Sequence, residues 1–190
     1  DLDSDMRVSS VSVRVSVRHG GIDRQEQPSP NRYTVRLEGE SASLDLGDFL
    51  AVWSDLGLSQ LRVRGAQGGA SWAGGRLRLE AAVGQTRRAI ERPEINAVVL
   101  ARTLRGVSAS AKLRGLGMRL YALDVRDDAA SVRNRGTLDP VGSRQAGAAA
   151  SLGLPGGCKA EAELSFAAYQ PRLGEPTTLK GRGAQASLSR

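Results

Sequence analysis

Strict alternation of apolar and polar residues is the feature that most constrains this chain. In residues 11–18, VSVRVSVR, four Val alternate with Ser and Arg. Successive side chains of a strand point to opposite faces of a sheet, so this period predicts a β-strand with one buried apolar face. The same period returns in residues 33–37, 77–83 and 164–168. We therefore expect a mainly β protein.

Further strands are expected in most of the remaining sequence, at residues 42–46, 59–66, 108–115, 118–126, 158–171 and 177–190. The last of these is read as an edge strand or a tail arm. Residues 95–106 fit a buried strand or a short helix, and their β-branched opening favours the strand. One short helix is predicted at residues 46–57, LGDFLAVWSDLG, with Asp48 as its N-cap and Gly57 as its stop. Residues 127–157, rich in small residues and turn formers, are open to interpretation as a loop, an interdomain link, or a short Ala-rich helix at 144–152.

Composition narrows the fold class. The chain of 190 residues is 40% apolar, 4% aromatic and holds 23 Gly, so its core is expected to consist of Val, Leu and Ala. We expect an antiparallel β-barrel or a split-barrel or sandwich domain at residues 1–115. A second β-rich region or extension is expected at 116–190. No run of 18 apolar residues occurs, so no transmembrane segment is predicted.

The charge is strongly positive and is carried mostly by Arg. Lys and Arg number 27 against 20 Asp and Glu, which gives a formal net charge of +7 and a pI near 10.4. These cations are spread along the predicted strands. The excess of Arg fits a GC-rich genome, or bidentate contacts to carboxylates and phosphates at interfaces, and the spread fits rows of exposed strand faces. The spread also argues against a nucleic-acid module, as does the scarcity of aromatic residues for base stacking.

The sequence shows no constellation of residues typical of catalysis or metal binding. His19 and Cys158 are the only residues of their types, so a zinc site of His and Cys is excluded. The Gly-rich residues 65–75 lack the Gly-Lys-Ser/Thr ending of a phosphate loop. Asp124, Asp127 and Asp128 do not have the spacing of a calcium loop. We therefore expect no catalytic, cofactor-binding or metal-binding residues, no small-molecule substrate and no enzyme activity.

Interfaces with other protein chains are the expected working surfaces. Exposed Arg on strand faces and an aromatic anchor in a hairpin are the residue types that such contacts favour. The candidate interface residues are Arg14, Arg18, Trp72, Arg76 and Arg78.

The order of several short pieces resembles one family. A strand with a basic-Gly turn (SVRHGG, 16–21), a polar insert (DRQEQPSP, 23–30) and a second strand (YTVRLEG, 33–39) are followed by LRVRG (61–65), SWAGGRLRLEAAV (71–83) and INAVVLA (95–101). This order over residues 1–115 resembles the N-terminal part of minor tail or tail-hub proteins of long-tailed bacteriophages. The resemblance implies a barrel-like domain in a ring around the tail axis or at the tail tip. It also implies a virion location, contacts with copies and other tail proteins, and no catalytic residues.

Three functions follow as hypotheses. The leading one is a structural component of a phage tail: tip, hub or distal ring. The alternative is a periplasmic β-groove module that handles lipid or assembles the envelope, because alternating Leu, Val and Ala strands also suit a long apolar groove. A nucleic-acid-binding module, motivated by the charge, is third.

Overall fold

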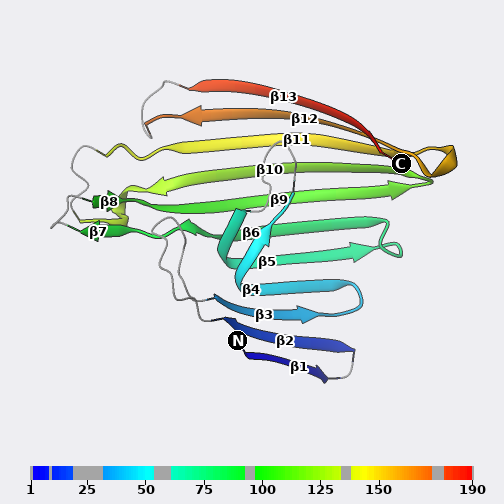
Figure 1. Ribbon diagram of the computed structural model, residues 1–190, viewed down its shortest axis with the longest axis horizontal. Coiled ribbons are helices and arrows are strands. Elements are labelled where there is room, and N and C mark those ends of the chain that lie inside the picture. Colours follow the sequence, from blue (N-terminus) through cyan, green and yellow to red (C-terminus); the bar gives the residue numbers. More distant parts are fainter. Residues whose placement is uncertain are drawn as a thin grey trace.

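The protein is described here by a computed structural model that covers residues 2–8, 10–18, 32–53, 61–92, 97–133, 138–172 and 178–189. It is dominated by one antiparallel sheet of 11 strands in the order β1-β2-β3-β4-β5-β6-β9-β10-β11-β12-β13 (Figure 1). The strands are β1 (Leu2–Val8), β2 (Val11–Arg18), β3 (Arg32–Glu38), β4 (Ala42–Ala51), β5 (Leu61–Trp72), β6 (Leu77–Arg87), β9 (Ala101–Leu113), β10 (Leu116–Asp128), β11 (Gly142–Gly153), β12 (Lys159–Gln170) and β13 (Leu179–Ser189).

Neighbours in this sheet are neighbours in the sequence, with one interruption. Between β6 and β9 the chain forms a separate two-stranded ribbon of β7 (Ile90–Arg92) and β8 (Ala97–Val99). This ribbon extends beyond the end of the large sheet (Figure 1). Two short 3₁₀ turns, Ala129–Ser131 and Pro155–Gly157, follow β10 and β11.

The two ends of the sheet differ in the length of their connections. At one end the strands are joined by two to five residues, at 9–10, 39–41, 73–76, 114–115 and 154–158. At the other end the connections are longer, at 19–31, 52–60, 88–100, 129–141 and 171–178. The sheet therefore has a short-turn end and a long-connection end.

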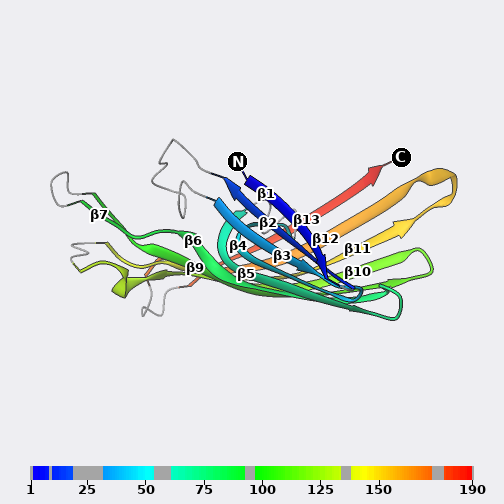
Figure 2. The ribbon, with the colours of Figure 1, turned by 90° about the horizontal axis from the view of Figure 1, so that it is seen from below.

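The sheet is curved, and its concave face carries a folded-over hairpin. In the edge-on view, β1 and β13 both rise toward the same side (Figure 2). On that side, the end of β4 and the start of β5 leave the sheet and cross over β5 and β6 (Figure 1). The main core cluster lies between this hairpin and the sheet, and its members are Phe49, Ala51, Trp53, Val63, Ala82, Leu104, Tyr121 and Leu123.

The structure confirms the mainly β, antiparallel class that the alternation predicted. The described residues form a single curved layer, and its edge strands β1 and β13 do not pair with each other. The strand expected at the C-terminus is indeed an edge strand. The loop, link or Ala-rich helix considered for 127–157 is wrong over residues 142–153, which form β11 and pair with both β10 and β12. The domain boundary predicted at 115/116 falls in the turn between β9 and β10, which pair from Leu113–Leu116 to Ala101–Asp128.

The helix predicted at residues 46–57 is wrong over its described part, because residues 46–51 belong to β4. The apolar residues there fit helical spacing, but Phe49, Ala51 and Trp53 also alternate, and the fold uses that alternation to cover the core. Gly47 has φ of +99°, which turns the strand over the sheet. A Cβ at Gly47 would lie 1.9 Å from the carbonyl oxygen of Tyr33, so only glycine fits this bend.

Candidate functional site: the two faces of the sheet

The convex face of the sheet is apolar and exposed. Cross-strand pairing places one continuous row of residues across eight strands of this face: Ala42, Ala70, Leu79, Ala109, Leu120, Ala148, Leu164 and Ala184. No charged or polar side chain interrupts this row. Its larger members are well exposed, with 63% of Leu120 and 55% of Leu164 accessible.

On the concave face, the row one residue further along each strand consists of polar residues and glycine, and it is buried or half-buried. The adjacent row reads Ser43, Gly69, Glu80, Ser108, Tyr121, Gly147, Ser165 and Gly183. Ser108 and Ser165 are buried, whereas Leu120 and Leu164 on the other face are not. Along these two rows the usual arrangement of a water-soluble sheet is inverted, whereas under the hairpin the concave face carries the apolar core.

The apolar face forms a band of limited height. On β9, Val107, Ala109, Ala111 and Leu113 point to the convex side, and Arg105 follows them toward the long-connection end. On β12 the band runs from Ala160 to Ala168. At about 3.3 Å per residue, these stretches measure roughly 20–27 Å along the strands. The band therefore begins near the short turns and stops before the long connections.

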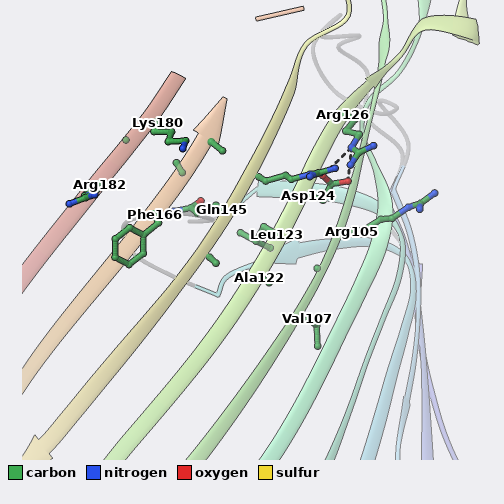
Figure 3. Close-up of a pocket in the computed structure, with 16 residues that line it drawn as sticks. Arg105, Val107, Ala122, Leu123, Asp124, Arg126, Gln145, Phe166, Lys180 and Arg182 are labelled. Carbon is green, nitrogen blue, oxygen red and sulfur yellow. Dashed lines mark hydrogen bonds and ion pairs between the residues drawn. The ribbon is translucent and has the colours of Figure 1, made fainter. Parts of the chain in front are cut away.

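A row of cations marks the long-connection boundary of the band. Arg105, Asp124, Arg144, Ala168 and Lys180 stand side by side on β9 to β13. With Arg126, Arg182 and Phe166 they line a groove of about 830 Å³ (Figure 3). Five cations and one carboxylate therefore meet where the apolar surface ends.

The hairpin on the concave face is held by a close fit between Trp53 and β9. A Cβ built on Gly106 would lie 2.1 Å from Cζ3 of Trp53, so the indole lies directly on the backbone there. Arg119 reaches from β10 and donates from Nη1 to the carbonyl oxygen of Trp53 at 3.1 Å. Only 2% of Trp53 is exposed. The polar concavity is thus partly filled by the chain's own hairpin.

Asp48 secures the point at which this hairpin leaves the sheet. β4 stops pairing with β3 after Gly47, which leaves the backbone N–H of Tyr33 without a strand partner, and Asp48 Oδ2 accepts from it at 3.0 Å. Arg62 and Arg64 donate to the same carboxylate at 3.0 and 2.8 Å. Burial alone raises the pKa of Asp48, but these hydrogen bonds and the two guanidinium charges outweigh it, and the pKa lies below its usual value.

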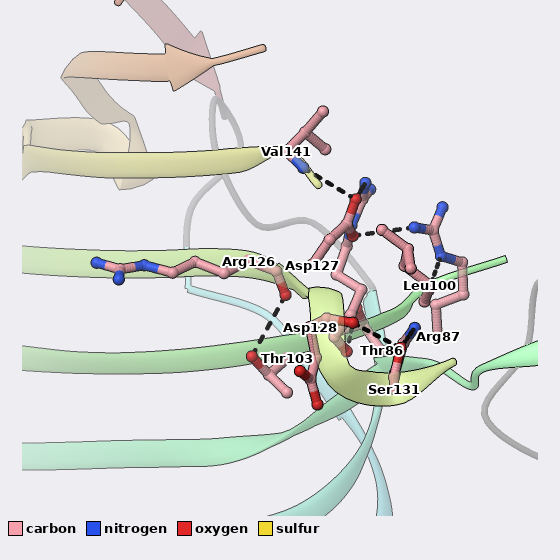
Figure 4. A network of polar contacts seen from close by, with 11 residues as sticks. Thr86, Arg87, Leu100, Thr103, Arg126, Asp127, Asp128, Ser131 and Val141 are labelled. Carbon is pink, nitrogen blue, oxygen red and sulfur yellow. Dashed lines mark hydrogen bonds and ion pairs between the residues drawn. The ribbon is translucent and has the colours of Figure 1, made fainter. Parts of the chain in front are cut away.

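A second buried carboxylate, Asp127, ties the long-connection end together (Figure 4). Arg102 donates to it at 2.7 Å and Arg87 at 2.9 Å. The backbone N–H of Val141 donates at 3.3 Å. Asp127 therefore joins β6, β9, β10 and the approach to β11, which makes it a structural anchor.

The predicted interface residues do not gather into one surface. Trp72 lies on the convex face beside Leu77 at the short-turn end, and Arg76 lies in the turn that follows. Arg78 lies on the concave face, where it pairs with Glu80 at 2.8 Å. Arg14 and Arg18 lie on the concave side of β2, opposite Arg36 and Arg32. The structure thus separates the one aromatic candidate from most of the Arg candidates.

The other residues considered for chemistry carry no assembled site in the described part of the chain. His19 lies outside the described residues. Cys158 is half-buried after the 3₁₀ turn that precedes β12. Asp124 and Asp127 are held by arginines, and no cluster of three or more His, Cys, Asp or Glu suited to a metal ion occurs among the described residues.

Sequence reasoning missed the sidedness of the sheet. The Val face of β2 was expected to be buried, yet Val11 is 40% exposed and the other three Val of β2 are only half-buried. The signal that could have revealed this is the partner row. In the row from Ser43 to Gly183, the residues are Ser, Gly, Glu or Tyr on every strand. Glycine on three of these eight strands is unusual for a surface that only faces water.

Comparisons with known proteins found no relative of this chain, so the two faces of the sheet are interpreted from the structure itself. No protein-family model, no curated protein and no solved structure matches the chain. Among the described residues, no helix has the length and apolarity needed to cross a membrane.

Proposed function

We propose that this protein is a membrane-embedded sheet of a cell or particle envelope, with its convex face against lipid acyl chains. The observation that carries the proposal is the pair of adjacent rows. The row from Ala42 to Ala184 on the convex face is wholly apolar, and the less exposed row from Ser43 to Gly183 on the concave face is polar or glycine. Strands that span a bilayer alternate in this sense, apolar toward lipid and polar toward the interior.

Strand dimensions support the same proposal. Strands β5, β6 and β9 to β13 have 11 to 13 residues, and a spanning strand needs about 9–11. At the strand tilt of about 35–45° found in such proteins, the apolar stretches of roughly 20–27 Å would cover about 14–22 Å of the bilayer, somewhat less than their usual band of about 25 Å. Short turns at one end and long connections at the other are also typical of them. In such strands every second residue is polar, so their apolar residues are not consecutive in the sequence.

The sheet edges impose a requirement on this arrangement. Unpaired backbone N–H and C=O groups cost several kcal/mol each in hydrocarbon. The proposal therefore needs β1 and β13 to pair, with each other or with neighbouring molecules. Both edges rise toward the concave side (Figure 2), which favours pairing around the hairpin. The hairpin would then fill part of a polar interior.

The two tryptophans provide the test, because the chain has one on each face. In vesicles whose lipids carry bromine on the acyl chains, we expect Trp72, 52% exposed on the convex face, to be quenched. Trp53, buried under the hairpin, should be quenched far less. Trp72→Phe and Trp53→Phe separate the signals. If Trp53→Phe does not fold, the difference between wild type and Trp72→Phe gives the same comparison. Equal quenching of both residues, or none, would overturn the proposal.

A structural role in a phage tail stays a second proposal, favoured by one observation. The strands β1 and β13 leave two unpaired edges, through which copies could join into a ring. Such a ring would be stable in water without lipid. Purification of the chain without detergent as a closed ring of defined mass would support the tail role and count against the membrane.

A further inference from the structure

We propose that the cationic groove at the boundary of the apolar band binds phosphate head groups of anionic lipids. This inference rests on the membrane placement proposed above, and it adds a lipid class and a set of binding residues. The groove contains Arg105, Arg126, Arg144, Lys180 and Arg182 with Asp124 as its one carboxylate (Figure 3). A net positive groove beside an apolar surface matches a ligand that has an anionic head and apolar chains.

The single carboxylate orders part of the groove without neutralising it. Asp124 accepts from Arg126 at 2.8 Å and from Arg144 at 3.2 Å. One negative charge is thus shared by two guanidinium groups, which fixes them while leaving a positive charge. Exposed, pre-oriented guanidinium groups are well suited to phosphate because they can donate in bidentate fashion.

The remaining cations are available for a ligand. Within the described residues, Arg105 and Lys180 form no ion pair, and both are exposed. Arg182 lies over the ring of Phe166, with 6.0 Å between its Cζ and the ring centroid. That contact holds the guanidinium at the edge of the apolar band, where a lipid phosphate would lie.

The floor of the groove distinguishes a lipid from other anions. Val107, Ala122, Ala146 and Phe166 form it, and they continue directly into the exposed apolar rows of the same strands. A free phosphate ion or a nucleic-acid backbone would leave this floor uncovered. Acyl chains would cover it, and the long side chains of Arg and Lys would extend from it toward the head groups.

The test measures which lipid stays on the protein. The full chain is reconstituted in phosphatidylcholine vesicles with a minor fraction of phosphatidylglycerol and extracted in mild detergent. Bound lipids are then counted by mass spectrometry. We expect phosphatidylglycerol to be enriched over its share in the vesicle. In Lys180→Gln/Arg182→Gln the enrichment should fall by about fivefold for each cation removed.

A matched control removes the same charge from the other face. Lys112 and Lys159 lie on the concave side, so Lys112→Gln/Lys159→Gln should leave the enrichment unchanged. Equal loss in both variants, no enrichment in the wild type, or displacement of the lipid by inorganic phosphate or by a short RNA at equal concentration would overturn the inference.

These outcomes can be told apart from a failure of the proposed membrane placement. Quenching of Trp72 without lipid enrichment would contradict the groove alone, and absence of that quenching contradicts the placement.

Discussion

The indole of Trp53 lies directly on the backbone of Gly106, so closely that a methyl group there would come within 2.1 Å of the ring. This contact joins the hairpin at the end of β4 to the middle of the large sheet. Because both partners are part of the covered face, the contact sets how firmly the hairpin stays in the concavity.

Gly106→Ala should therefore loosen the hairpin. The added Cβ has to push the Trp53 ring away, and overpacking of this kind costs about 1–3 kcal/mol. We expect a lower urea midpoint and a red-shifted Trp53 emission, measured in a Trp72→Phe background. Gly181→Ala, where a Cβ meets nothing within 4 Å, is the control and should change neither. A Gly106→Ala variant with unchanged emission would mean that Trp53 does not rest on β9.

Asp48→Asn should destabilise the fold by about 3 kcal/mol, since it leaves two partly buried arginines without their carboxylate. The measurement is equilibrium unfolding in urea. Asp45→Asn is the matched control, because Asp45 pairs at 2.6 Å with an Arg36 whose side chain is 48% exposed. An exposed pair contributes much less, about 0–1 kcal/mol. Equal effects of the two substitutions would contradict the anchoring role of Asp48.

Lowering the pH should remove the contribution of Asp48 to the stability of the fold. Its pKa in the fold is below the usual 3.8, so as the pH falls the unfolded chain takes up the proton first. The stabilisation is complete above the unfolded pKa and is lost as the pH falls through the folded pKa. Unfolding midpoints at pH 7 and pH 3 should differ more in the wild type than in Asp48→Asn. The same pH dependence in both proteins would exclude this assignment.

Leu120→Arg should impair insertion into vesicles, because Leu120 lies mid-band on the convex face. A cation at the bilayer midplane costs a spanning strand about 2–4 kcal/mol. The measurement is the fraction of protein that floats with vesicles in a density gradient. Gln185→Arg, on the concave face of β13, is the control and should float like the wild type. Full flotation of Leu120→Arg would argue that lipid does not cover this face.

The alternation in the sequence was sufficient to predict strands but not which face they cover. Val11 to Val17 and Leu77 to Val83 alternate whether their apolar side meets a protein core or a lipid. Only cross-strand register shows that Leu120 and Leu164 share one exposed row with Leu79. The period of a strand is a local property, whereas its sidedness depends on what covers the assembled sheet.

The candidate site was hidden for a related reason. Arg105, Arg144 and Lys180 lie far apart in the sequence, and none of them is next to another charged residue. They become a row only through the pairing of β9 to β13. The helix error at residues 46–57 has a different cause. The apolar residues there fit both the spacing of a helix and the alternation of a strand. Only the backbone shows which one is formed, and here Gly47 in a left-handed conformation bends a strand.

The sequential order of the strands has a consequence for how the molecule is made. Each new strand after β1 finds its partner in the strand just completed, and only the β7–β8 ribbon delays this once. Such local pairing is kinetically accessible, since little loop entropy is lost at each step. The sheet can thus grow by successive hairpins as the polypeptide emerges, with no step that has to wait for a distant part of the chain.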